Sequence, residues 1–104
     1  MELTVLGSSS EGNAYVLQNA GEALLLEAGI PFKKVLAALG NNVKKIVGCL
    51  ITHEHGDHAG RINEVLNYVV PVYASKGTIE AAKINSCWRP THIRTVSYTH
   101  LTLP

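Results

Sequence analysis

The sequence predicts a small α/β protein, because short apolar segments of strand length alternate with segments that carry helical periodicity. The chain has 104 residues, of which 46% are hydrophobic, and this favours a globular core over disorder. The clearest example is the apolar stretch 46–51, which reads as a buried strand. Apolar residues then follow at the offsets 0, 3, 4 and 7 of a helix: Ile62, Val65, Leu66 and Val69.

The first half of the chain is expected to contain three strands and a helix. Residues 3–6, 14–18 and 23–27 are the strands, with a serine- and glycine-rich loop at 7–13 and a turn at 19–21. Pro31 begins the helix, where its missing N–H costs little, and Gly40 ends it. The apolar stripe of this helix is Phe32, Val35, Leu36 and Leu39.

The second half is expected to begin with the central strand, residues 46–51, and a polar segment at 52–58. A helix at 62–69 and a strand at 70–74 follow, with Pro71 at the start of that strand. A short helix at 78–84 and a last strand at 90–96 complete the series. No repeat or linker interrupts it, so the chain reads as one domain or part of one.

The polar segment at 52–58 contains three of the five histidines and the only aspartate of the chain. Histidine and aspartate are the side chains that bind zinc and similar divalent ions. They form the pattern His-x-His-x-Asp-His: His53, His55, Asp57 and His58. This cluster follows a buried strand, and α/β proteins place their sites at the carboxyl ends of strands.

The spacing of the motif indicates two metal positions. Side chains two apart in an extended segment point the same way, so His53 and His55 can reach one ion. Gly56 is expected to let the chain turn sharply, so that Asp57 and His58 face a second ion. Two-metal hydrolytic sites hold their ions about 3.5–4 Å apart, within reach of one short loop. The alternative is a polar surface loop, but four ligand-type residues at this spacing favour a metal site.

These four residues resemble the signature of the metallo-β-lactamase fold. The segment 3–15, with its Ser-Gly-Asn sequence, resembles the opening of the YycJ/WalJ-like branch, whose members are metal-dependent hydrolases linked to phosphodiester and DNA-end chemistry. Segments 24–29 and 71–78 resemble later family elements. The resemblance implies a four-layer αββα sandwich, of which residues 1–95 supply the N-terminal half. Residues 96–104 form a tail that does not resemble the family's continuation.

The resemblance implies roles for the motif residues. His53 and His55 bind the first of two divalent ions, zinc or manganese, and Asp57 and His58 bind the second. Asp57 also serves catalysis by orienting the nucleophile. The family supplies a later histidine, a bridging aspartate and a final histidine from its second half. This chain has no second aspartate, and His92 and His100 stand in no comparable context. A fragment of this kind is expected to be inactive alone.

Three further residues are candidates for the surroundings of the metals. Glu27 stands where many superfamily members carry an aspartate that supports a metal-binding histidine; the alternative is a solvated acid at a strand end. Ser9 and Asn13 belong to the loop that the resemblance places beside the site; the alternative is an ordinary hairpin connection. A serine nucleophile is not expected there, because no histidine–aspartate relay is visible.

The predicted function is that of a dinuclear phosphodiesterase or nuclease in its full-length form, with DNA or another phosphodiester as partner. Open alternatives are a thioester or lactone hydrolase of the same fold, a metal-binding module without catalysis, and a structural protein in which the motif is incidental. The net charge of +1 gives no indication of a nucleic-acid-binding surface. No signal peptide or membrane-length apolar run is visible, so a cytoplasmic setting without a membrane partner is expected.

Two expectations concern packing. Strand residues that would face the missing half include Val47, Leu50 and Ile51 or their neighbours, so the isolated fragment is expected to self-associate. Cys49 and Cys87 are too few for a disulfide scaffold and do not show metal spacing. Cys49 reads as a small buried residue of the central strand.

Overall fold

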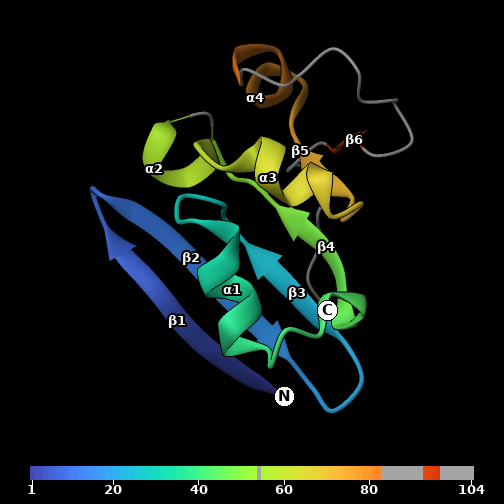
Figure 1. Cartoon of the computed structure of the whole chain (residues 1–104). Coiled ribbons are helices and arrows are strands. Elements are labelled where there is room, and N and C mark those ends of the chain that lie inside the picture. The colour runs from blue at the N-terminus through green and yellow to red at the C-terminus, as the bar shows by residue number, and fades with distance from the viewer. Residues whose placement is uncertain (54, 83–92, 97–104) are drawn as a thin grey trace.

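The computed structural model describes residues 1–53, 55–82 and 93–96, and within them six strands form one mixed sheet (Figure 1). The spatial order of the strands is their order in sequence. This arrangement of strands and helices confirms the predicted α/β class. The strands are β1 (Glu2–Ser9), β2 (Gly12–Gln18), β3 (Ala23–Leu26), β4 (Ile46–Leu50), β5 (Val72–Ala74) and β6 (Ile93–Thr95).

The first three strands are antiparallel, and β1 and β2 form a long hairpin. The prediction of a loop at 7–13 was wrong, since the two strands stay paired up to Ser9 and Gly12. Gly7 and Gly12 were interpreted as loop residues, but in the structure they let neighbouring backbone segments pack closely. A Cβ on Gly12 would lie 2.5 Å from the carbonyl oxygen of Gly29, and one on Gly7 would lie 2.9 Å from that of Gly12.

From β3 onward the strands are parallel, so their carboxyl ends meet at one edge of the sheet. Parallel neighbours need crossover connections, and short helices supply them. The helical segments are α1 (Phe32–Ala38), the 3₁₀ turn η1 (Val43–Lys45), α2 (Gly56–Ala59), α3 (Ile62–Asn67) and α4 (Lys76–Ala81). Helix α1 follows Pro31 and ends before Gly40, as predicted, and the positive φ of Gly40 (62°) suits a helix terminus.

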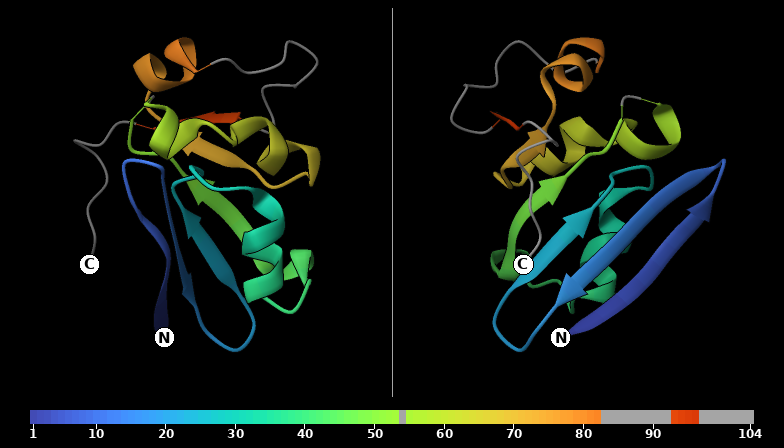
Figure 2. Two further views of the ribbon diagram at one scale, coloured as in Figure 1. Left: turned by 60° about the vertical axis from the view of Figure 1, so that its left-hand side comes forward. Right: turned by 180° about the vertical axis from the view of Figure 1, so that it is seen from behind.

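One face of the sheet is covered by α1 and α3, as the two views of Figure 2 show. Each of these helices buries three apolar residues, and the ring of Phe32 in α1 lies 4.8 Å from that of Tyr68 after α3. Beneath them, paired residues of neighbouring strands form a fully buried row: Val16, Leu25, Cys49 and Val72. The burial of Cys49 was predicted, and that burial raises the pKa of its thiol well above the ordinary value.

No described helix covers the opposite face of the sheet (Figure 2, right). The strand register places a second row of apolar and aromatic residues on this face. Five residues lie side by side in register across it: Val5, Tyr15, Leu26, Leu50 and Tyr73. Val5 is 58% exposed and the neighbouring Leu3 is 59% exposed. Val47, Leu50 and Ile51 were expected on a strand face that is not covered within this chain, and for Ile51 this was wrong. That residue points to the same side as Cys49 and is completely buried, whereas Val47 is exposed and Leu50 is half-buried.

Several element ends differ from the sequence predictions. Strand β3 ends at Leu26, because Glu27 adopts a left-handed conformation with φ of 70°. Helix α4 begins at Lys76 rather than at residue 78, because the Ser75 hydroxyl accepts a hydrogen bond from the Thr78 amide at 3.2 Å. The residues 83–92 and 97–104 lie outside the described part, and with them Cys87, His92, His100 and most of the predicted tail.

None of the helices in the described part of the chain is long and apolar enough to cross a membrane.

Candidate metal centre

The predicted metal motif occupies the junction between β4 and α2. Strand β4 ends at Leu50, and α2 begins at Gly56 with His55 as the residue that precedes it. The carbonyl oxygen of His55 accepts hydrogen bonds from the amides of His58 (2.9 Å) and Ala59 (2.8 Å). At Gly56 the chain passes from the extended backbone of His55 into a helical turn, without a positive φ at this glycine. The backbone of Asp57 therefore lies in a helix and not in a loop.

Three chain segments that are distant in sequence meet at this edge of the sheet. The parallel strands β3 and β4 end here, and the antiparallel β2 begins here. Backbone hydrogen bonds fix the connection after β3 to the end of β4, to α2 and to the start of β2. Glu27 donates to the carbonyl oxygen of Leu50 at 2.9 Å, Ala28 to that of His58 at 2.6 Å, and Gly29 to that of Asn13 at 3.0 Å. The motif is thus held on two sides by backbone that precedes it in sequence.

The structure brings the three predicted histidines of the motif together. The ring centroids of His53 and His58 lie 3.8 Å apart, and those of His53 and His55 lie 4.9 Å apart. Imidazole and carboxylate are the donors that zinc and manganese use, so the donor types fit a divalent ion. Among the described side chains, no group of three or more histidine, cysteine, aspartate or glutamate residues is arranged so that it could hold a metal ion. The side chain of the fourth predicted ligand, Asp57, is outside that description.

Glu27 is buried directly behind His58. Only 4% of Glu27 is exposed, its Oε2 lies 3.0 Å from Nδ1 of His58, and its Oε1 accepts a hydrogen bond from the Thr52 amide at 3.0 Å. The contact between Oε2 and Nδ1 is a close approach of the two groups and not a hydrogen bond. A carboxylate on Nδ1 favours a proton there, which leaves Nε2 as the nitrogen that can bind a metal.

Thr52 is a site residue that the sequence analysis missed. Its hydroxyl oxygen lies 3.0 Å from Nδ1 of His53, while its amide binds Glu27. Thr52 therefore links the environments of two predicted ligands and restrains the ring of His53. The sequence feature that could have identified Thr52 is its position, immediately before the first histidine of the motif and after the buried strand.

Asn13 and Ser9, the two predicted site-adjacent residues of the hairpin, differ in their contacts: Asn13 lies near His58, and the side chain of Ser9 bonds within the turn. The Asn13 side chain, in a residue only 7% exposed, places Nδ2 3.3 Å from Nε2 of His58 and donates to the carbonyl oxygen of Ser9 at 2.9 Å. The hydroxyl of Ser9 instead accepts from the Glu11 amide at 3.2 Å and supports the hairpin turn. Tyr15, which the sequence analysis did not single out, places its hydroxyl 3.4 Å from Oδ1 of Asn13.

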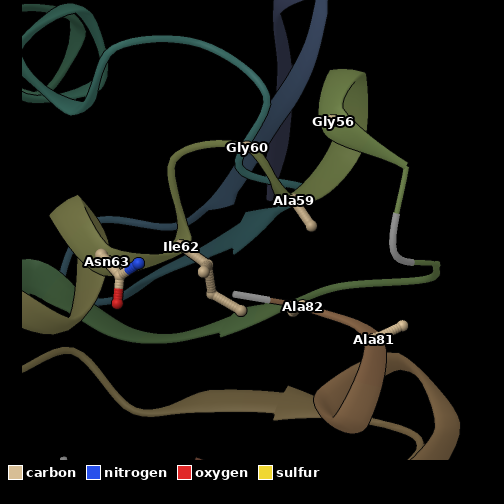
Figure 3. A pocket seen from close by; sticks show the side chains of 7 residues that line it. All are labelled: Gly56, Ala59, Gly60, Ile62, Asn63, Ala81 and Ala82. Atoms are coloured by element: carbon tan, nitrogen blue, oxygen red, sulfur yellow. The ribbon is translucent and has the colours of Figure 1, made fainter. Parts of the chain in front are cut away.

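A cavity of about 280 Å³ adjoins the motif on the side of α4 (Figure 3). Small and apolar residues make up much of its lining, which consists of Gly56, Ala59, Gly60, Ile62, Asn63, Ala81 and Ala82. None of the three motif histidines lines it. The cavity is therefore a neighbour of the metal motif and not the motif itself.

Residues 1–88 match the protein family described as "Anti-Pycsar protein Apyc1". Among curated proteins, the chain is 33% identical over 82 residues to the exodeoxyribonuclease WalJ of Streptococcus pneumoniae serotype 2 (strain D39 / NCTC 7466). This match covers 75% of the chain but only 30% of that protein. The chain is also 41% identical over 59 residues to a hydroxyacylglutathione hydrolase of Hahella chejuensis, covering 56% of the chain and 23% of the relative.

The fold recurs in solved structures. The metallo-β-lactamase fold protein YhfI from Bacillus subtilis superposes with a TM-score of 0.67 at 20% sequence identity. The superposition covers 90% of this chain and 44% of that protein. At this identity the likeness concerns the fold alone, and it agrees with the sheet and helix order described above.

Proposed function

Since the chain has the metallo-β-lactamase fold and belongs to the family described as Anti-Pycsar protein Apyc1, we propose that it provides half of the active centre of a divalent-metal-dependent phosphodiesterase. The observation that carries this proposal is the cluster of His53, His55 and His58 at the carboxyl edge of the sheet, with the buried Glu27 behind His58. A polar surface loop would not require a buried carboxylate behind one of its histidines.

The residues of the chain have distinct tasks in this proposal. His53 and His55 would hold one ion, and Asp57 and His58 a second, with zinc or manganese as the metal. Bound divalent ions supply Lewis acidity and favour ionisation of water near neutral pH. Glu27 and Thr52 fix the tautomer and orientation of His58 and His53. Asp57 orients the attacking water.

The choice of phosphodiester as substrate rests on relatives. The exodeoxyribonuclease WalJ matches over most of the described chain, and its name specifies DNA as substrate. We therefore extend DNA or a related phosphodiester to this protein, acting in the cytoplasm as the sequence predicted. Because the chain spans about 30% of that relative, we further propose that the active protein is longer and supplies the remaining metal ligands. The 104-residue chain alone would then lack the fixed metal geometry that hydrolysis needs.

A direct test is hydrolysis of bis(p-nitrophenyl) phosphate and of a 5′-labelled DNA strand, with Mn²⁺ or Zn²⁺. The 104-residue chain and the full-length protein would be assayed side by side, each with its Asp57→Ala variant. We expect turnover by the full-length protein only, and its loss in Asp57→Ala. Activity of the short chain that disappears on Asp57→Ala would show that this half suffices, contrary to the proposal.

One observation favours a second candidate function. The hydroxyacylglutathione hydrolase relative carries in its name an acyl-glutathione, a thioester substrate, although it matches a shorter part of the chain. A full-length protein that binds metal but cleaves a thioester or lactone instead of either phosphodiester would favour this candidate. Metal binding without turnover of any of these substrates would point to a non-catalytic metal-binding module.

A further inference from the structure

A hollow of about 310 Å³ lies beside the metal motif, between the turn of the β1–β2 hairpin and the start of α1. Two basic residues line it, Lys34 of α1 and Arg61, which precedes α3. The Arg61 amide donates to the carbonyl oxygen of Ala28 at 2.8 Å, and the Ala28 amide donates to that of His58 at 2.6 Å. The hollow and the metal motif are therefore fixed to the same connection after β3.

The two basic residues of this hollow differ in their partners. The guanidinium of Arg61 donates to Oε2 of Glu64 at 2.7 Å. A guanidinium has several N–H donors, so Arg61 can bind Glu64 and a further anionic oxygen together. Lys34 is exposed, and no ion pair between described residues includes it. The lining contains one described carboxylate, the exposed Glu11 of the hairpin turn, so positive charge exceeds negative charge around the hollow.

A second hollow, of about 440 Å³, adjoins the first, since Pro31 and Arg61 line both. Its lining includes Lys33 and Tyr68. Tyr68 is 47% exposed, whereas every other described phenylalanine or tyrosine is buried or half-buried. Its ring lies 4.8 Å from that of the buried Phe32, at an angle of 37°. A ring that packs on a buried neighbour and is still half exposed can stack with a planar ligand such as a nucleobase.

Cations beside an exposed aromatic ring are the combination with which proteins bind single-stranded nucleic acid. We propose that the two hollows bind the single strand of DNA next to the scissile phosphodiester: Lys34 and Arg61 contact a phosphate, and a base stacks on Tyr68. This inference rests on the proposed phosphodiesterase function and specifies the form of its substrate. A surface that contacts so few phosphates needs no strongly basic protein, which agrees with the net charge of +1.

The test measures binding of a fluorescein-labelled DNA single strand of about ten nucleotides to the full-length protein by fluorescence anisotropy. EDTA prevents hydrolysis, and the salt concentration is varied. Lys34→Gln should weaken binding about fivefold at about 0.1 M salt and reduce the slope of log affinity against log salt by about 0.7, the effect of one lost phosphate contact. Lys44→Gln, at an exposed lysine before β4 and thus at the other end of that strand from the motif, should change neither quantity.

Three further variants test the ring and the sign of the charge. Tyr68→Leu keeps an apolar contact with Phe32 but removes the aromatic face, and it should weaken binding of the strand about tenfold. Tyr68→Phe keeps that face and should change the affinity less than about twofold. Glu11→Gln removes the carboxylate from the lining of the first hollow and should strengthen binding, opposite to Lys34→Gln.

The outcomes distinguish this inference from the function on which it rests. An unchanged affinity and salt slope in Lys34→Gln would overturn the phosphate contact, and equal losses in Tyr68→Leu and Tyr68→Phe would overturn the stacking. A wild type that hydrolyses bis(p-nitrophenyl) phosphate with Mn²⁺ but does not bind the strand would overturn this inference alone. A wild type that binds the strand but hydrolyses neither compound would overturn the proposed function and leave the DNA-binding surface.

Discussion

Glu27 and His58 meet at 3.0 Å between Oε2 and Nδ1, although one follows β3 and the other lies in α2. The contact is possible because β3 and β4 are parallel neighbours whose carboxyl ends share one edge. The left-handed backbone of Glu27, with φ of 70°, is uncommon for a residue other than glycine and is typical of strained positions at functional sites. The amide of Thr52 holds the other carboxylate oxygen and so fixes the direction of the group.

This relationship predicts that Glu27→Gln reverses the tautomer of His58. The glutamine oxygen would keep the hydrogen bond from the Thr52 amide, so its NH₂ group would face Nδ1 of His58. Nδ1 must then accept, and the proton moves to Nε2, the nitrogen that would otherwise bind metal. Imidazole ¹⁵N NMR should show this change, and zinc affinity should fall roughly ten- to a hundredfold.

The matched control is Glu22→Gln, which alters an exposed glutamate next to the turn between β2 and β3. It should leave the ¹⁵N shifts of His58 and the zinc affinity unchanged. If Glu27→Gln preserved both quantities as well, Glu27 would not control the tautomer of His58.

The uncovered sheet face predicts self-association of the 104-residue chain. Leu3 and Val5 are more than half exposed on this face, beside the apolar row that continues across β2 to β5. The double substitution Leu3→Thr and Val5→Thr keeps strand propensity but removes apolar area. It should weaken association about tenfold, as sedimentation velocity would measure.

Val69→Thr is the control, because Val69 is 63% exposed but lies after α3, outside the sheet. Its positive φ of 62° strains valine and threonine alike, since both are β-branched. A wild-type chain that stays monomeric and melts cooperatively would contradict the expectation that this face needs a cover.

The hydrogen bonds to the Glu64 carboxyl predict that its contribution to the free energy of unfolding depends on pH. Partial burial alone would raise the pKa of this carboxyl, but hydrogen bonds from the Phe32 amide (3.0 Å) and from Arg61 (2.7 Å) lower the pKa overall. The first of these bonds serves the start of α1, where Pro31 offers no side-chain cap. Glu64→Ala should therefore lower the free energy of unfolding by about 1 kcal/mol at pH 7.

The sign of the pH effect follows from the lowered pKa. The charged carboxylate stabilises the fold fully above the unfolded pKa, about 4.3, and this stabilisation is lost as the pH falls through the lower folded pKa. Denaturant unfolding at several pH values should show the wild type and Glu64→Ala converging in acid. Glu80→Ala, at an exposed position in α4, should match the wild type throughout. A difference for Glu64→Ala that persists unchanged in acid would mean that lost packing, not charge, explains it.

Much of the fold could be predicted because each element has a local signal. The buried strand before the motif is a continuous apolar stretch, and α1 is bounded by Pro31 and Gly40. The length over which the two strands of the hairpin stay paired was missed for a physical reason. Gly7 and Gly12 were read as markers of a loop, whereas they leave room for the backbone of Gly29 and its neighbours to pack closely.

The candidate site was only partly predictable. His53, His55 and His58 belong to one short segment of the sequence, so the close approach of their rings follows from the motif itself. The contact between Asn13 and His58 depends on the register of β1 and β2 and on the connection after β3, which no local pattern reports. Thr52 was missed because a threonine beside a histidine has no distinctive spacing.

A zinc titration of the 104-residue chain by calorimetry tests most directly whether the motif at the junction of β4 and α2 is a divalent-metal centre. Binding should be weak, because the chain offers two protein ligands for each ion where a structural zinc site has four. His55→Ala should weaken it further by at least about tenfold, whereas His100→Ala, a histidine outside the motif, should not change it. Equal zinc affinity in the wild type and His55→Ala, or no zinc binding by the wild type, would contradict the account.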